Sequence, residues 1–495
     1  MSVKRMRRWG ISLIAVMIAA MVSQCAWAQE DEAGLEQFNA AVEHYEAGEL
    51  EQAREGFLAA LEQRPDDPTV LVWLGSISLQ LGETEEAIEQ LERAVELDPE
   101  YAVSYNNLGN AHLALNDLEA AEESYLAAIE RDPNYFDAHF NLANLHARRE
   151  DYQQAFEAYE RALEITPQDF EARVSFGHAL RKAAETERAI EQFEAARQIN
   201  PQASDVLTVL GTLYIQSGEI EQATEAYQAA IEVDPEIVEA HVGLGLALHN
   251  AERYEEAIEH WQTAAELDES SFAARYNLGL AYAAMNDYAA AAQAYETALA
   301  LKSDDANTLN NLGWALYEQN RASEAASRFR EAIAANPDLQ VAHLNLALAL
   351  EKGGQTEEAL AQWQDAATRF PESAAAHCGL ANLHYAQGRY EEALPAYLRT
   401  LELQDDNLEA HNNAGLIYLN DGELEQAVEH FEAALEIDPS YVYALNNIGV
   451  ALEKQGDLEG ALDNYRRALE AQPDYEPAQK NHDRLERRMD GAVTG

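Results

Sequence analysis

Proline recurs in this chain at a fixed interval of 34 residues. Ten of its thirteen prolines share that register. They are Pro65, Pro99, Pro133, Pro167, Pro201, Pro235, Pro337, Pro371, Pro439 and Pro473. Twelve intervals of 34 residues separate the first of them from the last, without an insertion or a deletion. A fixed period of this length predicts an array of small repeats that bury their apolar faces against one another, and such an array offers an extended surface rather than a catalytic cleft.

With this proline placed at position 32, thirteen repeats run from residue 34 to residue 475. Position 20 is alanine in every repeat, position 24 is a large apolar residue, and position 27 is alanine except at Thr400. Positions 7 and 8 are mostly leucine and a small residue. Repeat six shows the pattern at positions 4, 7, 8, 11, 20, 24, 27 and 32 with Leu207, Leu210, Gly211, Tyr214, Ala223, Tyr227, Ala230 and Pro235.

Spacings of three and four residues predict α-helices. Each repeat is therefore expected to contain two antiparallel helices, at positions 1–14 and 18–31, with a tight turn near position 15. Glycine or asparagine at position 15 tolerates the left-handed conformation that ends a helix. Small residues at positions 8 and 20 let the two helix axes approach closely. The predicted fold class is all-α.

This order of residues resembles the tetratricopeptide repeat family over about nine tenths of the chain. The resemblance implies a right-handed superhelical solenoid of thirteen antiparallel helix pairs. It also implies that first helices line a concave groove and that second helices form the convex outside. Three repeats depart from the pattern, with Glu269, Ser303 and Asp405 in place of proline, and Pro395 is expected to disturb the first turn of a second helix.

The two ends of the chain lie outside the array. Four cations between residues 4 and 8 precede an apolar run from Ile11 to Val22, and Ala26 and Ala28 supply small residues for cleavage. Residues 1–28 are therefore predicted to be a secretory signal peptide, which makes the protein exported, either periplasmic or secreted. An uncleaved N-terminal anchor is the alternative. Residues 476–495 are predicted to form a C-terminal capping helix, because repeat arrays need polar ends.

The formal charge of −56 is unevenly distributed over the repeats. The first helices of repeats two to thirteen hold nine acidic and eight basic residues, a net charge of −1. Nearly all the acidity thus belongs to second helices and turns, which predicts a nearly neutral groove and a solvated acidic outside. The same charge excludes nucleic acid as a partner, and it excludes direct membrane binding once the signal is cleaved.

Asparagine is frequent in the first helices although it is a mediocre helix former. Its amide both donates and accepts hydrogen bonds, which suits the backbone of an extended polypeptide. The groove is similar in this respect to the repeat array of O-linked GlcNAc transferases, where asparagines hold substrate chains. An alternative is that these amides only link neighbouring helices. The candidate peptide-binding asparagines at position 6 are Asn107, Asn141, Asn277, Asn311, Asn345, Asn413 and Asn447.

Tyr276, Trp314 and Tyr317 are a second candidate site, at positions 5, 9 and 12 of adjacent repeats. Exposed aromatic side chains there would form an anchor pocket and would suit a carbohydrate; packing against the next repeat is the alternative. The family's clamp for acidic C-terminal tails needs lysine at position 5, and no repeat has Lys or Arg there. Binding of such tails is therefore not predicted.

No catalytic or metal-binding residue is predicted. Nine of the fourteen histidines fall at positions 4 and 11, which are aromatic packing sites, so an interior role is expected. The sequence lacks a metal motif, a phosphate-binding loop and a nucleophile elbow. Only twenty residues follow the last repeat, which is too few for a catalytic domain. No enzymatic activity, metal or cofactor is expected.

These observations predict an exported scaffold of the bacterial envelope that binds proteins or extended peptides in its groove. The alternative is a scaffold subunit of a polysaccharide-export or outer-membrane assembly machine that binds a glycan or a pore protein. A third possibility is an accessory to an enzyme encoded separately.

Overall fold

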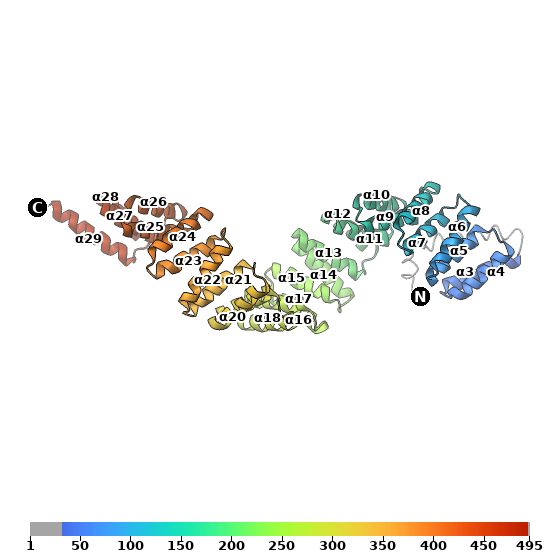
Figure 1. Cartoon of the computed structure of the whole chain (residues 1–495), viewed down its shortest axis with the longest axis horizontal. Helices are drawn as coiled ribbons and strands as arrows, with labels where there is room; N and C mark the ends of the chain where they lie inside the picture. Colours follow the sequence, from blue (N-terminus) through green and yellow to red (C-terminus); the bar gives the residue numbers. More distant parts are fainter. Residues whose placement is uncertain (1–31, 494–495) are drawn as a thin grey trace. The chain divides into compact units, whose positions relative to one another are not determined.

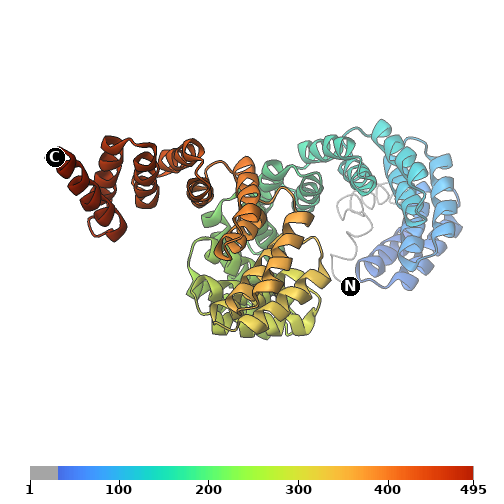
Figure 2. The same ribbon diagram turned by 60° about the vertical axis from the view of Figure 1, so that its left-hand side comes forward.

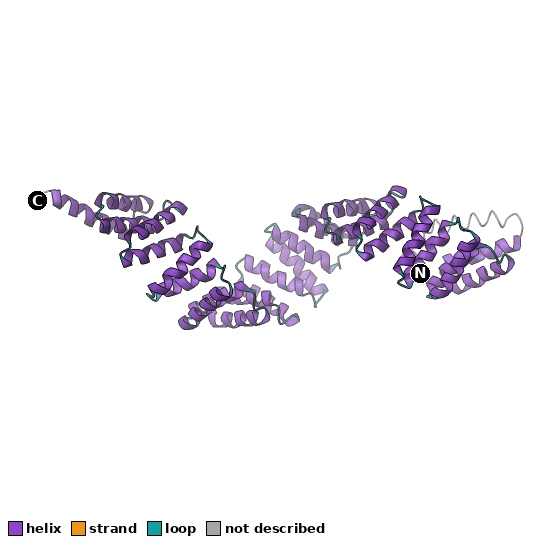
Figure 3. Ribbon diagram, turned by 45° about the horizontal axis from the view of Figure 1, so that its top comes forward, coloured by secondary structure: helices purple, strands orange, loops and turns teal. Residues whose placement is uncertain are grey.

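The computed structural model describes residues 32–493, so the predicted signal peptide lies outside the described residues. All regular elements in that range are α-helices (Figure 3). They number 27. The first helices of the repeats are α3 (Glu32–Glu46), α5 (Pro68–Leu81), α7 (Ala102–Ala114), α9 (Phe136–Arg149), α11 (Phe170–Lys182), α13 (Ser204–Ser217), α15 (Val238–Asn250), α17 (Phe272–Ala284), α19 (Ala306–Glu318), α21 (Gln340–Lys352), α23 (Ala374–Ala386), α25 (Leu408–Asp421) and α27 (Val442–Gln455).

The second helices alternate with them along the chain (Figure 1). They are α4 (Leu50–Gln63), α6 (Thr84–Leu97), α8 (Leu118–Arg131), α10 (Tyr152–Ile165), α12 (Thr186–Ile199), α14 (Ile220–Val233), α16 (Tyr254–Leu267), α18 (Tyr288–Leu301), α20 (Ala322–Ala335), α22 (Thr356–Arg369), α24 (Tyr390–Leu403), α26 (Leu424–Ile437) and α28 (Leu458–Ala471). The last helix, α29 (Glu476–Val493), follows repeat thirteen. The all-α fold class is confirmed.

The chain divides into two compact halves, and the division lies between α15 and α16, inside the seventh repeat. The N-terminal half ends at Ala251 and the C-terminal half begins at Glu252. Within each half, every helix packs against the next one in the chain (Figure 2).

The two helices of a repeat meet where a ring at position 24 fills the space above a small residue at position 8. A Cβ atom added to Gly109 would lie 2.5 Å from the Tyr125 ring, and one added to Gly313 would lie 2.7 Å from the Phe329 ring. The alanine at position 20 is completely buried in the described repeats, as at Ala121. The close approach that the sequence predicts is therefore present, and a larger side chain at position 8 would have to displace the ring.

Second helices begin and end one residue earlier than expected, at positions 17 and 30. The residue at position 31 has left the helical conformation, as at Asp98 with φ −133° and ψ 87°. A following proline disfavours the α conformation at the residue before it, which explains this ending. Asp268 has the same conformation before Glu269, so the proline reinforces a turn that other residues also form. α24 runs from Tyr390 to Leu403 through Pro395.

The turn between the two helices contains a left-handed residue at position 15. At Gly218, φ is 78°, and the following Glu219 N–H donates to the carbonyl of Tyr214 over 2.8 Å. Six repeats place another residue type in this conformation. Three of these are asparagine, but the others are Glu150, Ala184 and Glu252, which the sequence pattern does not predict. A non-glycine residue there is strained, because its Cβ crowds the backbone.

α29 continues the stack beyond the last second helix. Ala478 and Leu485 are completely buried against repeat thirteen, and Ala478 shares a core cluster with Leu445 and Ala468. Arg484 and Arg488 both contact the carboxylate of Glu453. α29 thus covers the apolar side of α27 and α28 with a helix whose remaining residues are mostly polar.

We expect Ala184→Gly to stabilise the fifth repeat by about 1 kcal/mol, because Ala184 has φ 62° and glycine adopts this conformation without strain. Hydrogen exchange of the Ala184 and Glu185 amides, which close the turn, should slow accordingly. Gly218→Ala is the matched control and should accelerate exchange in the sixth repeat. Faster hydrogen exchange of these amides in Ala184→Gly would contradict the inference that Ala184 is strained.

Candidate functional site

The first helices form the more closely spaced of two layers. Within the N-terminal half α5 contacts α7 and α13 contacts α15, and within the C-terminal half α19 contacts α21 and α25 contacts α27. Across residues 32–493, neighbouring second helices have no contact of this extent. Since the closer spacing marks the inner side of a stack, the first helices form the inner layer of each half.

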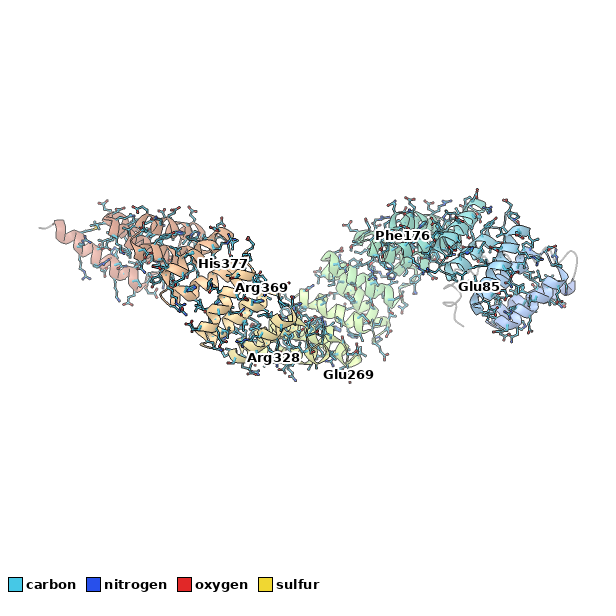
Figure 4. All side chains as sticks on the ribbon, viewed as in Figure 1. Glu85, Phe176, Glu269, Arg328, Arg369 and His377 are labelled. Carbon is cyan, nitrogen blue, oxygen red and sulfur yellow. The ribbon has the colours of Figure 1, made fainter. Side chains whose placement is uncertain are left out.

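The outer layer carries the charge. Exposed acids such as Glu85 on α6 project from the second helices (Figure 4). Arginines on one second helix pair with acids on its neighbour, as Arg188 does with Glu160 and Arg330 with Glu358, both over 3.0 Å. Exposed pairs of this kind contribute at most about 1 kcal/mol each. The outer layer is therefore acidic and solvated, whereas the first helices of repeats two to thirteen are close to neutral.

Hydrogen-bonded chains of side-chain amides cross the inner layer, and we call each chain an amide relay. In the first relay Asn141 Nδ2 donates to Asn106 Oδ1 over 2.9 Å, and Asn106 Nδ2 donates to Asn107 Oδ1 over 3.4 Å. Asn107 Nδ2 then donates to Ser76 Oγ over 3.1 Å. All four side chains are buried. This relay ties α9 to α7 and α7 to α5.

The C-terminal half contains two more relays. In the second relay Asn345 donates to Asn310 over 3.0 Å, Asn310 contacts Asn311 over 3.4 Å, and Asn311 donates to Tyr276 Oη over 3.2 Å. The third relay starts on α29 and ends on α24. It passes through Asn481, Asn446, Asn447, Asn412, Asn413 and Tyr397, with successive separations of 2.9, 3.3, 3.2, 3.2 and 3.1 Å.

The relays give the predicted asparagine site a structural role. Six of its seven members donate an amide hydrogen into the preceding repeat. They are Asn107, Asn141, Asn311, Asn345, Asn413 and Asn447. Asn277 is half-buried on α17. These side chains thus link neighbouring helices, which is the alternative that the sequence leaves open. Peptide binding by the same side chains stays a prediction.

Asparagine at position 9 has a different partner, the tyrosine at position 24 of the same repeat. Tyr125 donates to Asn110 Oδ1 over 2.8 Å and Tyr397 donates to Asn382 Oδ1 over 2.7 Å. Burial raises the pKa of both tyrosines, so each hydroxyl keeps its proton and acts as the donor. A polar residue at position 9 accompanied by tyrosine at position 24 is the sequence signal for this contact.

The predicted aromatic site divides into two parts. Trp314 and Tyr317 stack on α19 with ring centroids 5.1 Å apart, and Lys352 Nζ lies 4.0 Å from the Tyr317 centroid. Tyr276 instead stacks on Phe272 at 5.9 Å and accepts the hydrogen bond from Asn311. Trp314 is 36 % exposed, and both tyrosines are half-buried. The structure therefore joins Trp314 to Tyr317 and places Tyr276 at the end of a relay.

Histidines at position 4 bind the turn that precedes their helix, a role that the sequence pattern does not predict. In five repeats the histidine Nε2 lies 3.0 to 3.2 Å from the backbone carbonyl at position 32 of the preceding repeat. One of them is His377 on α23 (Figure 4). Because a carbonyl only accepts, Nε2 carries the proton. Arg173 and Arg275, also at position 4, donate to the corresponding carbonyls of Pro167 and Glu269. The shared signal is a donor at this position.

Three further properties of the described residues bear on function. Among residues 32–493, no three His, Cys, Asp or Glu side chains are grouped so as to hold a metal ion. Burial raises the pKa of the half-buried Cys378 thiol, which disfavours the nucleophilic thiolate. None of the described helices combines the length and the apolar character needed to cross a membrane.

Family models settle the relationship of the chain to known proteins. One tetratricopeptide repeat model matches residues 106–170 and overlapping segments from 208 to 476, and a second TPR repeat model matches residues 75–116. Together the matches cover more than half of the chain. The chain belongs to the tetratricopeptide repeat family. A comparison with curated proteins finds no match.

Several solved structures are similar to the chain at low sequence identity. YrrB, a TPR protein with an unusual peptide-binding site, is 24 % identical over 38 % of this chain and 97 % of its own, with a TM-score of 0.35. The APC/C hetero-tetramer Cut9-Hcn1 is 15 % identical over 87 % and 98 %, with a TM-score of 0.38. MamA is 25 % identical over 33 % and 95 %, with a TM-score of 0.32.

Asn310→Ala is expected to destabilise the ninth and tenth repeats by about 1–3 kcal/mol, because it leaves the buried amide of Asn345 without its acceptor. Hydrogen exchange of α19 and α21 amides measures the effect. Asn307→Ala, at an exposed position of the same helix, is the matched control and should change little. Equal hydrogen-exchange protection in the two variants would mean that the second amide relay does not stabilise the inner layer.

The pair of His411 and His430 predicts a pH dependence. Their Nδ1 atoms are 3.1 Å apart. Burial and then His411 lower the pKa of His430, and Glu429 opposes this more weakly. Because the folded pKa lies below the unfolded value of about 6.5, the unfolded state binds more protons. The stabilisation is therefore complete above pH 6.5 or so and is lost as the pH falls through the folded pKa.

His430→Gln should remove this pH-dependent contribution. Glutamine forms the equivalent contact in repeat ten, where Gln362 Nε2 lies 3.1 Å from His343 Nδ1. Urea unfolding midpoints at about pH 7.5 and about pH 5 should differ less for His430→Gln than for the wild type. An unchanged difference would exclude His430 as the titrating group.

Proposed function

We propose that this protein is a non-catalytic scaffold in the cell envelope and that it binds protein or extended peptide segments along its first helices. Tetratricopeptide repeat arrays in general mediate protein–protein interactions. The observation that carries the proposal is the separation of charge between the two layers. A neutral inner layer favours recognition by hydrogen bonds and apolar contacts, whereas the acidic outer layer keeps the protein soluble.

The amide relays support the proposal through their effect on side-chain freedom. An asparagine that already donates to a neighbouring repeat, such as Asn345 to Asn310, has a fixed orientation before any ligand arrives. Binding to a fixed amide costs less conformational entropy than binding to a free one. The seven position-6 asparagines and the aromatic residues Tyr276, Trp314 and Tyr317 are the side chains proposed for the contact.

The proposed location rests on the N-terminal sequence alone. Its cations, apolar run and small residues before Gln29 have the anatomy of an export signal. In the exported protein the partners would be envelope or secreted proteins. Nucleic acid is not a proposed partner, because a chain with a formal charge of −56 repels phosphates.

A second function is favoured by the stacked pair of Trp314 and Tyr317. Aromatic side chains are common in carbohydrate sites, and Trp314 is 36 % exposed. In this alternative the protein is a scaffold subunit of a polysaccharide-export or outer-membrane assembly machine, and the same layer holds a glycan or a pore protein.

Site-specific photo-crosslinking in intact cells of the native host tests the proposal. A photoreactive residue in place of Ala375, exposed on the first helix α23, should form adducts with protein in the envelope fraction. The same residue in place of Ala361, exposed on the second helix α22, is the matched control and should form few. N-terminal sequencing of the recovered protein should begin at Gln29.

The nature of the adduct separates the two functions. Protease-sensitive adducts at position 375 support protein binding, and adducts removed by glycosidase but not by protease support the carbohydrate alternative. Adducts only at position 361 would place the contact on the acidic layer and reject both. Recovery of the protein in the cytoplasm with residues 1–28 intact would reject export.

A further inference from the structure

The first helices of repeats eight, nine and ten present an uncharged surface in a strongly acidic chain. Positions 2, 5 and 9 of α17, α19 and α21 contain no charged residue. They are Ala273, Tyr276, Leu280, Asn307, Asn310, Trp314, Val341, Leu344 and Leu348. The corresponding positions in repeats four to six include Asp137, Glu171 and Asp205. Repeats two and three are also uncharged there, but with Ser76 and Asn110 at position 9 they lack the large apolar residues of repeats eight to ten.

Side-chain contacts hold these three helices side by side. Asn311 on α19 donates to Tyr276 on α17, and Asn345 on α21 donates to Asn310 on α19. Lys352 Nζ on α21 donates to the backbone carbonyl of Tyr317 over 2.8 Å. One buried core cluster lies beneath them, and four residues of this surface pack on it while staying partly exposed: Tyr276, Leu280, Leu344 and Leu348.

Two large apolar residues of this surface extend further into solvent. Trp314 is 36 % exposed and Val341 is 43 % exposed. Contiguous exposed apolar side chains are uncommon on soluble proteins and mark interaction sites. We call the set Tyr276, Leu280, Trp314, Val341, Leu344 and Leu348 the apolar strip.

We propose that the apolar strip binds an uncharged apolar segment of a partner polypeptide, with Trp314 as the anchor. This inference rests on the proposed function and names the ligand class and the repeats for it. Trp314 is suited to anchoring because stacking on Tyr317, itself held by Lys352, fixes its orientation. A pre-ordered aromatic side chain loses little entropy on binding and is a common interaction hot spot.

The charge of this protein limits which peptides the apolar strip can bind. An acidic segment would be repelled by the chain as a whole, and a basic one would be attracted to the outer acids rather than to the strip. A charged side chain buried against Leu280 or Leu348 would lose its water without gaining an ion partner. Glu318, Glu351 and Lys352, at positions 12 and 13, border the strip and leave its centre neutral.

The geometry favours a polypeptide over a sugar. Carbohydrate sites combine a flat aromatic platform with hydrogen-bonding groups around it. Here Tyr317 is already covered by Trp314 and Lys352. The position-9 neighbours of Trp314 on the adjacent first helices are Leu280 and Leu348, which offer no hydrogen bond to sugar hydroxyls.

Fluorescence anisotropy with defined peptides tests the strip. The probe is a fluorescein-labelled eight-residue peptide of alternating serine and leucine, and its comparison peptide has glutamate in place of serine. The purified full chain should bind the serine–leucine peptide and not the glutamate–leucine peptide. Trp314→Ala should weaken binding by about tenfold or more, as loss of an anchor does. Raising the salt from about 0.05 M to about 0.5 M should change the affinity less than about twofold.

Leu126→Ala is the matched control, since Leu126 is 49 % exposed on the second helix α8 and lies outside the strip. It should leave binding unchanged, which separates the strip from general adhesion of an apolar peptide. Circular dichroism of both variants should retain the helical signal, so that a loss of affinity reports the contact.

Three outcomes would overturn the strip as a peptide site. They are equal binding by Trp314→Ala and the wild type, equal binding of the two peptides, and absence of binding at about 1 mM peptide. Binding of a chito-oligosaccharide that depends on Trp314, without peptide binding, would assign the strip to carbohydrate instead. In each case, protease-sensitive adducts at position 375 would still support the proposed function, because α23 lies outside the strip.

Discussion

The packing of a position-24 ring over a position-8 small residue is the contact on which the rest of the structure depends. It brings the two helices of a repeat close enough for Tyr295 to fill the space where a Cβ of Gly279 would lie, only 2.3 Å from the ring. A single helix pair buries too little surface for stability, so each repeat also packs on its neighbours. The first helices then come into direct contact, and the inner layer follows from this arrangement.

The two layers satisfy their polar groups by different chemistry. Neighbouring second helices are connected by exposed arginine–carboxylate ion pairs such as Arg188 with Glu160, in which both partners stay hydrated. First helices use amide relays, which need no charge and therefore tolerate burial. Asn106, with no exposed surface, illustrates the difference, since a carboxylate at this place would require a counter-ion. The neutral character of the inner layer is thus built into its hydrogen bonding.

The all-α class, the alternation of helix pairs and the close helix approach could be predicted from sequence because each depends on residues within one 34-residue period. Contacts between periods were harder to predict. The donation from His343 to the carbonyl of Pro337 joins two repeats through a backbone atom, and nothing in the side-chain pattern identifies that acceptor. Glu150 and Ala184 at left-handed positions were missed because their residue types do not favour that conformation. Trp314 and Tyr317 are predicted as parts of one site, but the contact of Lys352 with Tyr317 and the separate role of Tyr276 required the structure.

The amide relays run in one direction, from the C-terminal repeat of each set towards the N-terminal one. The effect of duplicating or deleting a repeat on stability therefore depends on where that repeat lies in the chain. Between Asn481 and Tyr397 an inserted repeat without asparagine at positions 5 and 6 would interrupt a continuous series of donors, whereas the repeat of Val174 and Ser175 has no relay to break. Loss or insertion of a repeat within a relay should therefore destabilise the array more than the same change between relays, because it leaves buried amides without hydrogen-bond partners.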